Sequence, residues 1–185
     1  MAQFEQAIPF VLRWEGGETV DSGGYTKFGI SQNAYPNLNI AALTIEDAKT
    51  IYRRDYWNRI LGDQIRHQVN ALALFDYAVN AGPGRAVQDA QRVLNARGAS
   101  LAIDGRMGPK TLAAINQRGP AFAGDLTRAR MGFYNRLVQM NPAKYGIYLK
   151  GWMRRANDLM THIPKAANLL VPLIFAAGML YLLKR

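Results

Sequence analysis

The segment from Arg13 to Ile30 constrains the fold of this chain more than any other part of the sequence. Before it, apolar residues recur at helical spacing, and Glu15 continues the same helix face: Phe4, Ile8, Val11 and Leu12. Two glycines follow Glu15 at once and end the helix. From Tyr25 onward the segment alternates as a short strand does. The sequence therefore predicts a helix followed by a glycine-rich β-hairpin packed beside it.

Glu15 is the candidate general acid. A carboxylate on the core side of a helix end loses water, and desolvation favours its protonated form. The expected position at a helix–loop junction leaves the carboxyl within reach of a cleft. The alternative is a capping or salt-bridged Glu, which we consider weaker because negative charge is disfavoured at a helix C-terminus.

The hairpin that follows Glu15 carries three further candidate site residues. It would bring Asp21 and Thr26 back across from the acid, and it also carries Tyr25. An acid on one side, with a carboxylate and a hydroxyl on the other, can protonate a glycosidic oxygen and hold a water molecule. Taken singly, Asp21 could be a turn residue and Thr26 an ordinary strand residue. Their spacing after Glu-Gly-Gly favours catalytic roles, and we assign Tyr25 to substrate binding.

Residues 66–81 form a second informative segment, which is apolar nearly all round and predicts a buried central helix. Asp76 and Asn80 are the polar exceptions and share one face at i and i+4. Polar groups in a buried helix need partners. The two residues could line the floor of a cleft and bind sugar there, or they could form a hydrogen-bonded pair in the core. Both interpretations stay open, and we take the two residues as substrate-binding candidates.

Composition narrows the class of enzyme. The chain has 23 Lys and Arg against 13 Asp and Glu, a formal charge of +10, which suits an anionic target such as wall polymers. The predicted helices 125–140 and 145–163 carry many arginines, which read as a mostly solvated basic surface. No nucleic-acid motif is present. With no cysteine and two histidines without ligand spacing, zinc and cysteine peptidases are excluded. We expect no metal and no cofactor.

Several strings resemble one family. Glu15-Gly16-Gly17, then Gly-Gly-Tyr-Thr at 23–26 and Gly29-Ile30, are similar to the N-terminal signature of glycoside hydrolase family 108, lysozyme-like muramidases of phages and bacteria. The string at 75–84 is similar to the helix beneath the substrate groove of lysozyme folds. Asp-Gly-x-x-Gly-Pro-x-Thr at 104–111 resembles the peptidoglycan-binding segment that accompanies the family, although a Pro-initiated helix alone could explain it.

The resemblance spans roughly residues 4–160 and implies an α+β, mainly α-helical, lysozyme-like fold with a small β-hairpin lobe. It implies a catalytic region at 1–82 and a helical, peptidoglycan-binding region at 83–163. The implied reaction is hydrolysis of the β-1,4 bond between N-acetylmuramic acid and N-acetylglucosamine in peptidoglycan, as by a phage endolysin. Glu15 would be the acid, and Asp21 and Thr26 would place water. The alternatives are a lytic transglycosylase using Glu15 alone and a non-catalytic wall-binding or virion protein.

The C-terminal segment 166–183 is uncharged and lies between Lys165 and Lys184-Arg185. As a helix it would span about 27 Å, close to a hydrocarbon core of about 30 Å, and flanking basic residues can snorkel. We therefore expect a single-pass transmembrane anchor rather than a buried or interfacial helix. Residues 1–12 do not resemble a signal peptide. The expected location is a host inner membrane or virion membrane, with the enzyme acting on the periplasmic wall.

Overall fold

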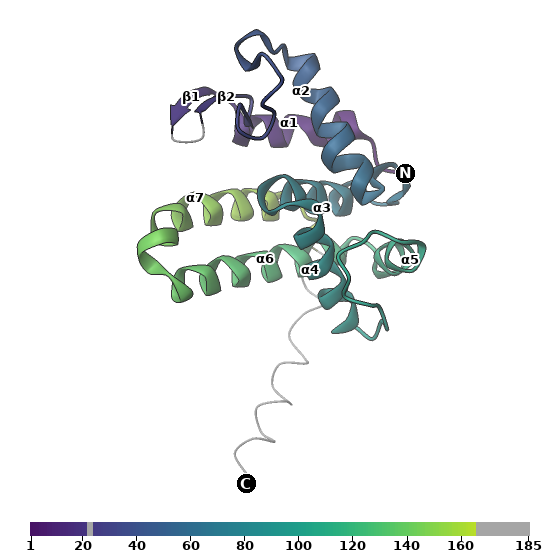
Figure 1. The fold of residues 1–185 in the computed structure, drawn as a ribbon. Helices are drawn as coiled ribbons and strands as arrows, with labels where there is room; N and C mark the ends of the chain where they lie inside the picture. Colours follow the sequence, from purple (N-terminus) through teal and green to yellow (C-terminus); the bar gives the residue numbers. More distant parts are fainter. Residues whose placement is uncertain (22–23, 166–185) are drawn as a thin grey trace.

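The computed structural model describes residues 1–21 and 24–165. Within these residues the fold is mainly helical with one small antiparallel sheet (Figure 1). The helices are α1 (Phe4–Glu15), α2 (Ile45–Tyr52), α3 (Gln68–Ala81), α4 (Pro83–Asn95), α5 (Pro109–Arg118), α6 (Ala121–Met140) and α7 (Pro142–Thr161). Shorter helical turns lie at Ile40–Ala42, Arg53–Trp57, Asn58–Ile60 and Gly62–Gln64.

Helix α3 is the centre of the molecule and contacts α1, α4 and α6. Its residues 70–78 are all buried, as its apolar sequence predicts. Phe75 on α3 packs against Phe4 and Trp57, with ring centroids 5.8 and 5.4 Å away. These aromatic contacts join the N-terminal helix to the central one. Trp57 is fully buried, so it serves packing.

The sheet contains β1 (Glu18–Asp21), β2 (Gly24–Lys27) and β3 (Ile30–Ser31) in that order. Its register places Thr26, on the middle strand, opposite Thr19 and Ser31. Phe28 and Gly29 join β2 to β3 and both have positive φ, 52° and 75°, as a two-residue type I′ hairpin requires. This turn brings the sheet back to the end of α1.

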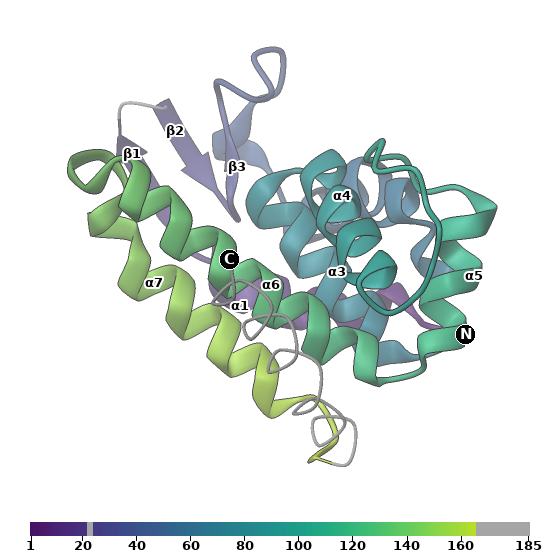
Figure 2. The same cartoon turned by 90° about the horizontal axis from the view of Figure 1, so that it is seen from below.

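Helices α6 and α7 form an antiparallel pair, and the turn between them lies at the same end of the molecule as the sheet (Figures 1 and 2). Asn141 in this turn caps α7, since its Oδ1 accepts from the Lys144 amide at 3.0 Å. Trp152 on α7 stacks on Tyr134 of α6 with centroids 4.9 Å apart. The pair therefore packs through aromatic side chains.

The expected fold class included a transmembrane helix, and that part of the prediction is wrong. Among the helices formed by residues 1–21 and 24–165, none is both long and apolar enough to cross a bilayer. Helices α6 and α7 have 20 residues each but carry charged residues along their length. The segment expected to span, 166–183, lies outside the described residues. The anchor, the membrane partner and the membrane location are therefore withdrawn.

Candidate active site

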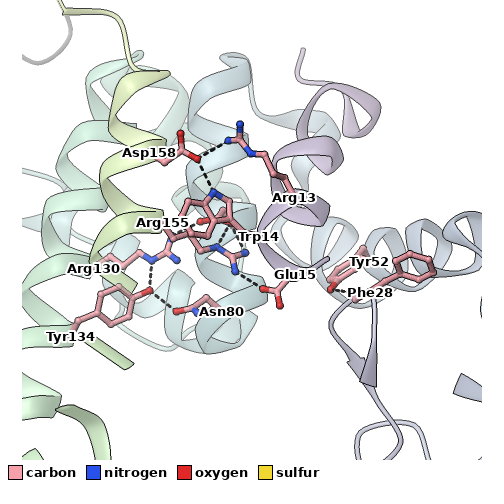
Figure 3. Close-up of polar contacts among 11 residues, drawn as sticks. Arg13, Trp14, Glu15, Phe28, Tyr52, Asn80, Arg130, Tyr134, Arg155 and Asp158 are labelled. Atoms are coloured by element: carbon pink, nitrogen blue, oxygen red, sulfur yellow. Dashed lines mark hydrogen bonds and ion pairs between the residues drawn. The ribbon is translucent and has the colours of Figure 1, made fainter. Parts of the chain in front are cut away.

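The last three residues of α1 all bind α7 (Figure 3). Arg13 Nη2 and Trp14 Nε1 both donate to Asp158 Oδ2, at 2.6 and 2.7 Å. Arg155 Nη1 donates to Glu15 Oε1 at 2.5 Å. Asp158 and Arg155 are three residues apart and so face the same side of α7. These bonds fix the C-terminal end of α1, and with it the candidate acid.

Behind Glu15 lies a buried ion-pair cluster. Asp76 is 0% exposed, and its Oδ1 accepts from Arg155 Nε at 2.8 Å. Its Oδ2 accepts from Arg130 Nη1 at 2.5 Å. Arg130 Nε also donates to the hydroxyl of Tyr134, which in turn donates to Asn80 Oδ1 at 2.5 Å. Two guanidinium groups therefore face two carboxylates, those of Asp76 and Glu15, in the interior of the protein.

The charge balance of this cluster keeps its arginines ionised. Burial acts to lower the pKa of Arg155, but the charges of Asp76 and Glu15 outweigh burial and raise it. The pKa of Arg130 is raised in the same way, against burial, chiefly by Asp76. A buried guanidinium without a carboxylate partner would cost several kcal/mol. The negative charge of Asp76 thus keeps Arg155 ionised in the interior, so that Arg155 contacts Glu15 as a cation.

The other side of Glu15 faces the hairpin turn. A Cβ atom added to Gly29 would lie 2.7 Å from Glu15 Cβ, 2.9 Å from Glu15 Oε2 and 2.6 Å from the Tyr52 hydroxyl. Tyr52 donates to the Phe28 carbonyl at 2.8 Å, which holds the turn in place. The Glu15 side chain remains 22% exposed. Among the described residues, no hydrogen bond is formed with Oε2, so this oxygen can meet a substrate.

An open cavity of about 330 Å³ is lined by Tyr56 and Asp55, among other residues. Tyr52 links it to Glu15, because Tyr52 lies beside Gly29 and its ring centroid is 5.7 Å from that of Tyr56, which lines the cavity. Tyr35 and Arg59 also line it. Aromatic faces beside a few fixed polar groups are typical of small-ligand sites.

Asp55 is the fixed acceptor in this cavity. Tyr35 donates to Asp55 Oδ2 at 2.7 Å, and Arg54 binds both carboxylate oxygens. The hydrogen bond from Arg54 is the main cause of a lowered pKa of Asp55, and it outweighs burial. Asp55 is therefore an ionised acceptor at neutral pH. It lies on the π-helical turn Arg53–Trp57, a feature frequent at functional sites.

The predicted hairpin residues lie on the sheet as follows. Tyr25 donates its hydroxyl to Glu18 Oε2 at 2.7 Å, and this bond is the main cause of the raised pKa of Tyr25. Thr26 is half-buried on the middle strand. Asp21 ends β1 opposite Gly24, but its side chain lies outside what the structure describes. The sheet that carries these three residues approaches Glu15 at Gly29. The catalytic roles of Asp21 and Thr26 and the binding role of Tyr25 stay predictions.

Comparisons with known proteins show the family of this chain. A family model described as Glycosyl hydrolase 108 matches residues 8–82, and one described as Predicted Peptidoglycan domain matches residues 85–157. The solved structure of SagA from Brucella abortus is 30% identical, with a TM-score of 0.71, and the alignment covers 86% of this chain and 92% of SagA. A search of curated proteins finds no significant match. The chain belongs to glycosyl hydrolase family 108. The family 108 protein is thus a glycoside hydrolase that acts on peptidoglycan.

Two expectations for the family 108 site change. Asp76 cannot bind substrate as predicted, because it is fully buried and both of its oxygens are bound by arginines. The open alternative, a satisfied polar group in the core, holds for Asp76. Asn80 is only partly buried, although Tyr134 occupies its Oδ1. The salt-bridged Glu considered weaker from the sequence is also present, since Arg155 pairs with Glu15.

Sequence reasoning missed three residues of the family 108 site: Arg130, Tyr134 and Arg155. Arg130 and Arg155 were expected on a solvated surface, but they are 1% and 5% exposed. A signal was available for both. Arg130 follows Leu126 by four residues on the buried stripe of α6, and Arg155 precedes Leu159 by four on α7. A cation on an apolar stripe indicates a buried carboxylate partner.

The string at 104–111 forms an internal turn in the family 108 chain. Gln91 on α4 is 1% exposed, and its Nε2 donates to Asp104 Oδ1 at 2.8 Å and to Thr111 Oγ1 at 3.3 Å. Its Oε1 accepts from the Gly105 amide at 3.0 Å. Asp104 and Thr111 therefore bind Gln91, and their side chains stabilise the approach to α5.

Proposed function

We propose that this chain is a muramidase that hydrolyses the β-1,4 bond between N-acetylmuramic acid and N-acetylglucosamine. One observation carries the proposal. Glu15 has one carboxyl oxygen held by a buried arginine, while the other is free of bonds to the described residues and lies at a partly exposed position. A carboxyl group fixed in this way can present a proton in one direction, as a general acid must.

The proposed proton transfer uses the two oxygens of Glu15 differently. Protonated Oε2 donates to the glycosidic oxygen of the leaving sugar, while Oε1 keeps its bond to Arg155. As the proton leaves, negative charge develops on Glu15 beside the guanidinium of Arg155, which stabilises it. Asp76 compensates Arg155 throughout. The bond to Arg155 also fixes the side-chain rotamer, so little reorganisation accompanies the transfer.

In the second half of the proposal, Asp21 and Thr26 hold a water molecule on the face of the sugar opposite Glu15. This arrangement would invert the configuration at the anomeric carbon. What supports it is the turn at Gly29, which brings the sheet of both residues against Glu15. We further propose that Tyr25 and Asn80 contact the glycan, and that neighbouring sugars bind in the cavity beside Tyr56. A role in phage lysis stays a prediction.

Product analysis tests the reaction type. Purified peptidoglycan is digested, and the released muropeptides are weighed by mass spectrometry, with the anomeric configuration followed by NMR at early times. Hydrolysis with inversion is expected. A product that lacks one water would show a lytic transglycosylase, in which the muramic 6-hydroxyl attacks in place of water. No released sugar at all would leave a wall-binding protein and would contradict the proposal.

Variants of the water-holding pair test the second half separately. Thr26→Val and Asp21→Asn are each expected to reduce hydrolysis while binding to insoluble peptidoglycan is retained, because each removes a contact to the water and none to the sugar. Thr50→Val, on α2, is the matched control. If Asp21→Asn is inert while Thr26→Val is damaging, Asp21 does not hold the water.

A further inference from the structure

A second cavity, of about 630 Å³, lies between α4 and α6, within the part of the chain that matches the peptidoglycan domain. Its size falls within the range of about 300–1,000 Å³ common for ligand sites. We refer to it as the α4–α6 groove. Its apolar lining consists of small residues: Val93 on α4, Ala96 directly after it, and Ala129 and Gly132 on α6. Small apolar side chains of this kind leave space in the groove and offer a surface against which methyl groups can pack.

The groove lies on the opposite side of α6 from the catalytic cluster. Arg128, Gly132 and Arg136 follow one another at steps of four residues and therefore share a face. Arg130 and Tyr134 are offset from them by two residues, on the far side of the same helix. A ligand in the α4–α6 groove therefore does not compete with a sugar at Glu15.

The charge of the groove is unbalanced. Two aspartates are bound by more guanidinium groups than they can neutralise. Asp89 accepts from Arg85 and Arg92, and Asp125 accepts from three arginines: Arg97, Arg118 and Arg128. Arg136 also lines the groove and has no acidic partner within residues 1–21 and 24–165.

The carboxylates of these clusters are built into the fold. Asp89 and Asp125 have side chains only 6% and 5% exposed, and the Tyr77 hydroxyl donates to Asp89 Oδ2 at 2.6 Å. Three of the arginines they bind, Arg92, Arg97 and Arg128, line the groove, and these ion pairs order their side chains before any ligand arrives. Pre-ordered guanidinium groups bind carboxylates with good geometry and small loss of entropy.

We propose that the α4–α6 groove binds the free carboxylates of a peptidoglycan stem peptide. This inference rests on the proposed function, because it takes peptidoglycan as the substrate. A stem peptide combines several carboxylates with alanine methyl groups, which matches the basic rim and the small apolar lining. A phosphate-rich polymer would match the rim but not the lining. The bound peptide would belong to a strand other than the one being cut, and would raise the local concentration of substrate at the cleft.

Calorimetry with a sugar-free peptide tests the proposal. The probe is synthetic L-alanyl-γ-D-glutamyl-meso-diaminopimelyl-D-alanyl-D-alanine, compared with the same peptide with all its carboxylates amidated. Amidation is expected to weaken binding at least about tenfold, equivalent to about 1.4 kcal/mol. Raised ionic strength should weaken binding of the free acid, because part of the attraction is screened.

Two variants locate the binding. Gly132→Leu adds a side chain to the lining at a helical position where a Cβ meets only Arg136 Nη1, at 3.5 Å, so folding should be retained. Arg136→Gln removes an exposed charge. Each is expected to weaken peptide binding about tenfold or more, whereas Arg66→Gln, an exposed arginine outside the groove, should not. Thermal melting checks that each variant is folded.

The outcomes separate this proposal from the muramidase reaction. A folded protein that cuts glycan strands but does not bind the peptide overturns the groove assignment alone. Peptide binding that Gly132→Leu and Arg136→Gln leave unchanged also overturns it. If the protein binds phosphatidylglycerol vesicles but not the peptide, the groove recognises lipid phosphate groups, and the proposal is contradicted. A protein that binds the peptide but releases no sugar contradicts only the proposed function.

Discussion

Clusters of arginine and aspartate lie on both faces of α6, but the two clusters differ in charge balance and burial. Toward Glu15, Arg130 and Arg155 are buried and face as many carboxylates as there are guanidinium groups. Toward the α4–α6 groove, arginines outnumber their aspartates and remain partly exposed. The arginines of the first set are buried, while several of the second set line an open cavity.

The difference shows how charge balance decides what an aspartate–arginine cluster does. In a balanced and buried cluster no net charge is left to attract a ligand, and the ion pairs act by holding one side chain, Glu15, in position. In an unbalanced cluster at a surface, the aspartates order the arginines, and the remaining positive charge attracts anions. Substitution of the central aspartate should therefore have different consequences on the two sides.

The largest effect on stability is expected for Asp76→Asn. Breaking a buried ion pair by removal of one partner costs about 3–5 kcal/mol, because uncompensated charge is left behind. Here two buried guanidinium groups would lose their shared carboxylate. Urea unfolding measures the loss. Asp63→Asn, whose side chain is half exposed, is the control and should cost much less. An Asp76→Asn loss within the range of the control would show that the cluster is not a structural unit.

Asp125→Asn sharpens the comparison with a smaller expected loss. Its three arginines are partly exposed and can be solvated, so a cost of about 1–3 kcal/mol is expected at pH 7. A loss equal to that of Asp76→Asn would contradict the distinction between the two faces.

The same residue predicts a pH dependence. Burial acts to raise the pKa of Asp125, but hydrogen bonds from Arg128, Arg97 and Arg118 outweigh burial and lower it. A lowered pKa in the folded state gives stability that is present above the unfolded pKa of about 3.9. That stability is lost as pH falls through the folded value. As the pH falls below about 4, Asp125→Asn should therefore lose less stability than the original protein. Parallel loss in both would rule out this contribution.

Gly29→Ala should have a selective effect on activity. A non-glycine residue in the left-handed region costs about 1–2 kcal/mol. Gly17→Ala is the matched control, since Gly17 also has positive φ, 120°, but its added Cβ would have no neighbour within 4 Å. Only at Gly29 would the methyl group press on Glu15. Hydrolysis should fall more in Gly29→Ala than in Gly17→Ala. Equal activity in both variants would show that the Gly29 turn does not hold Glu15 in its catalytic position.

Local features of the fold could be predicted from the sequence because neighbours in the chain determine them. The capping box of α2 is an example, in which Thr44 and Asp47 bond each other reciprocally. The buried course of α3 and the end of α1 at Glu15 follow equally from periodicity and glycine. The family resemblance, carried by short strings around Glu15, is confirmed by the family models.

The rest of the site depends on contacts between distant residues. Glu15 and Arg155 are 140 positions apart, and Asp76 and Arg130 are 54 apart. Periodicity can show that Arg155 faces a core, but it cannot show which carboxylate lies there. Asp76 was for this reason assigned to substrate. The membrane anchor was inferred from an uncharged run and its flanking basic residues, and it is not supported by any helix within the described residues.

The central claim is that Glu15 donates the proton, and one measurement tests it most directly. Initial rates of reducing-end release from purified peptidoglycan are compared for the original protein, Glu15→Gln and Glu46→Gln, the last an exposed glutamate on α2. Gln can keep the bond from Arg155 but has no acidic proton, so the rate should fall about 100- to 10,000-fold, while Glu46→Gln stays near the original rate. A folded Glu15→Gln protein with near-original activity would contradict the account.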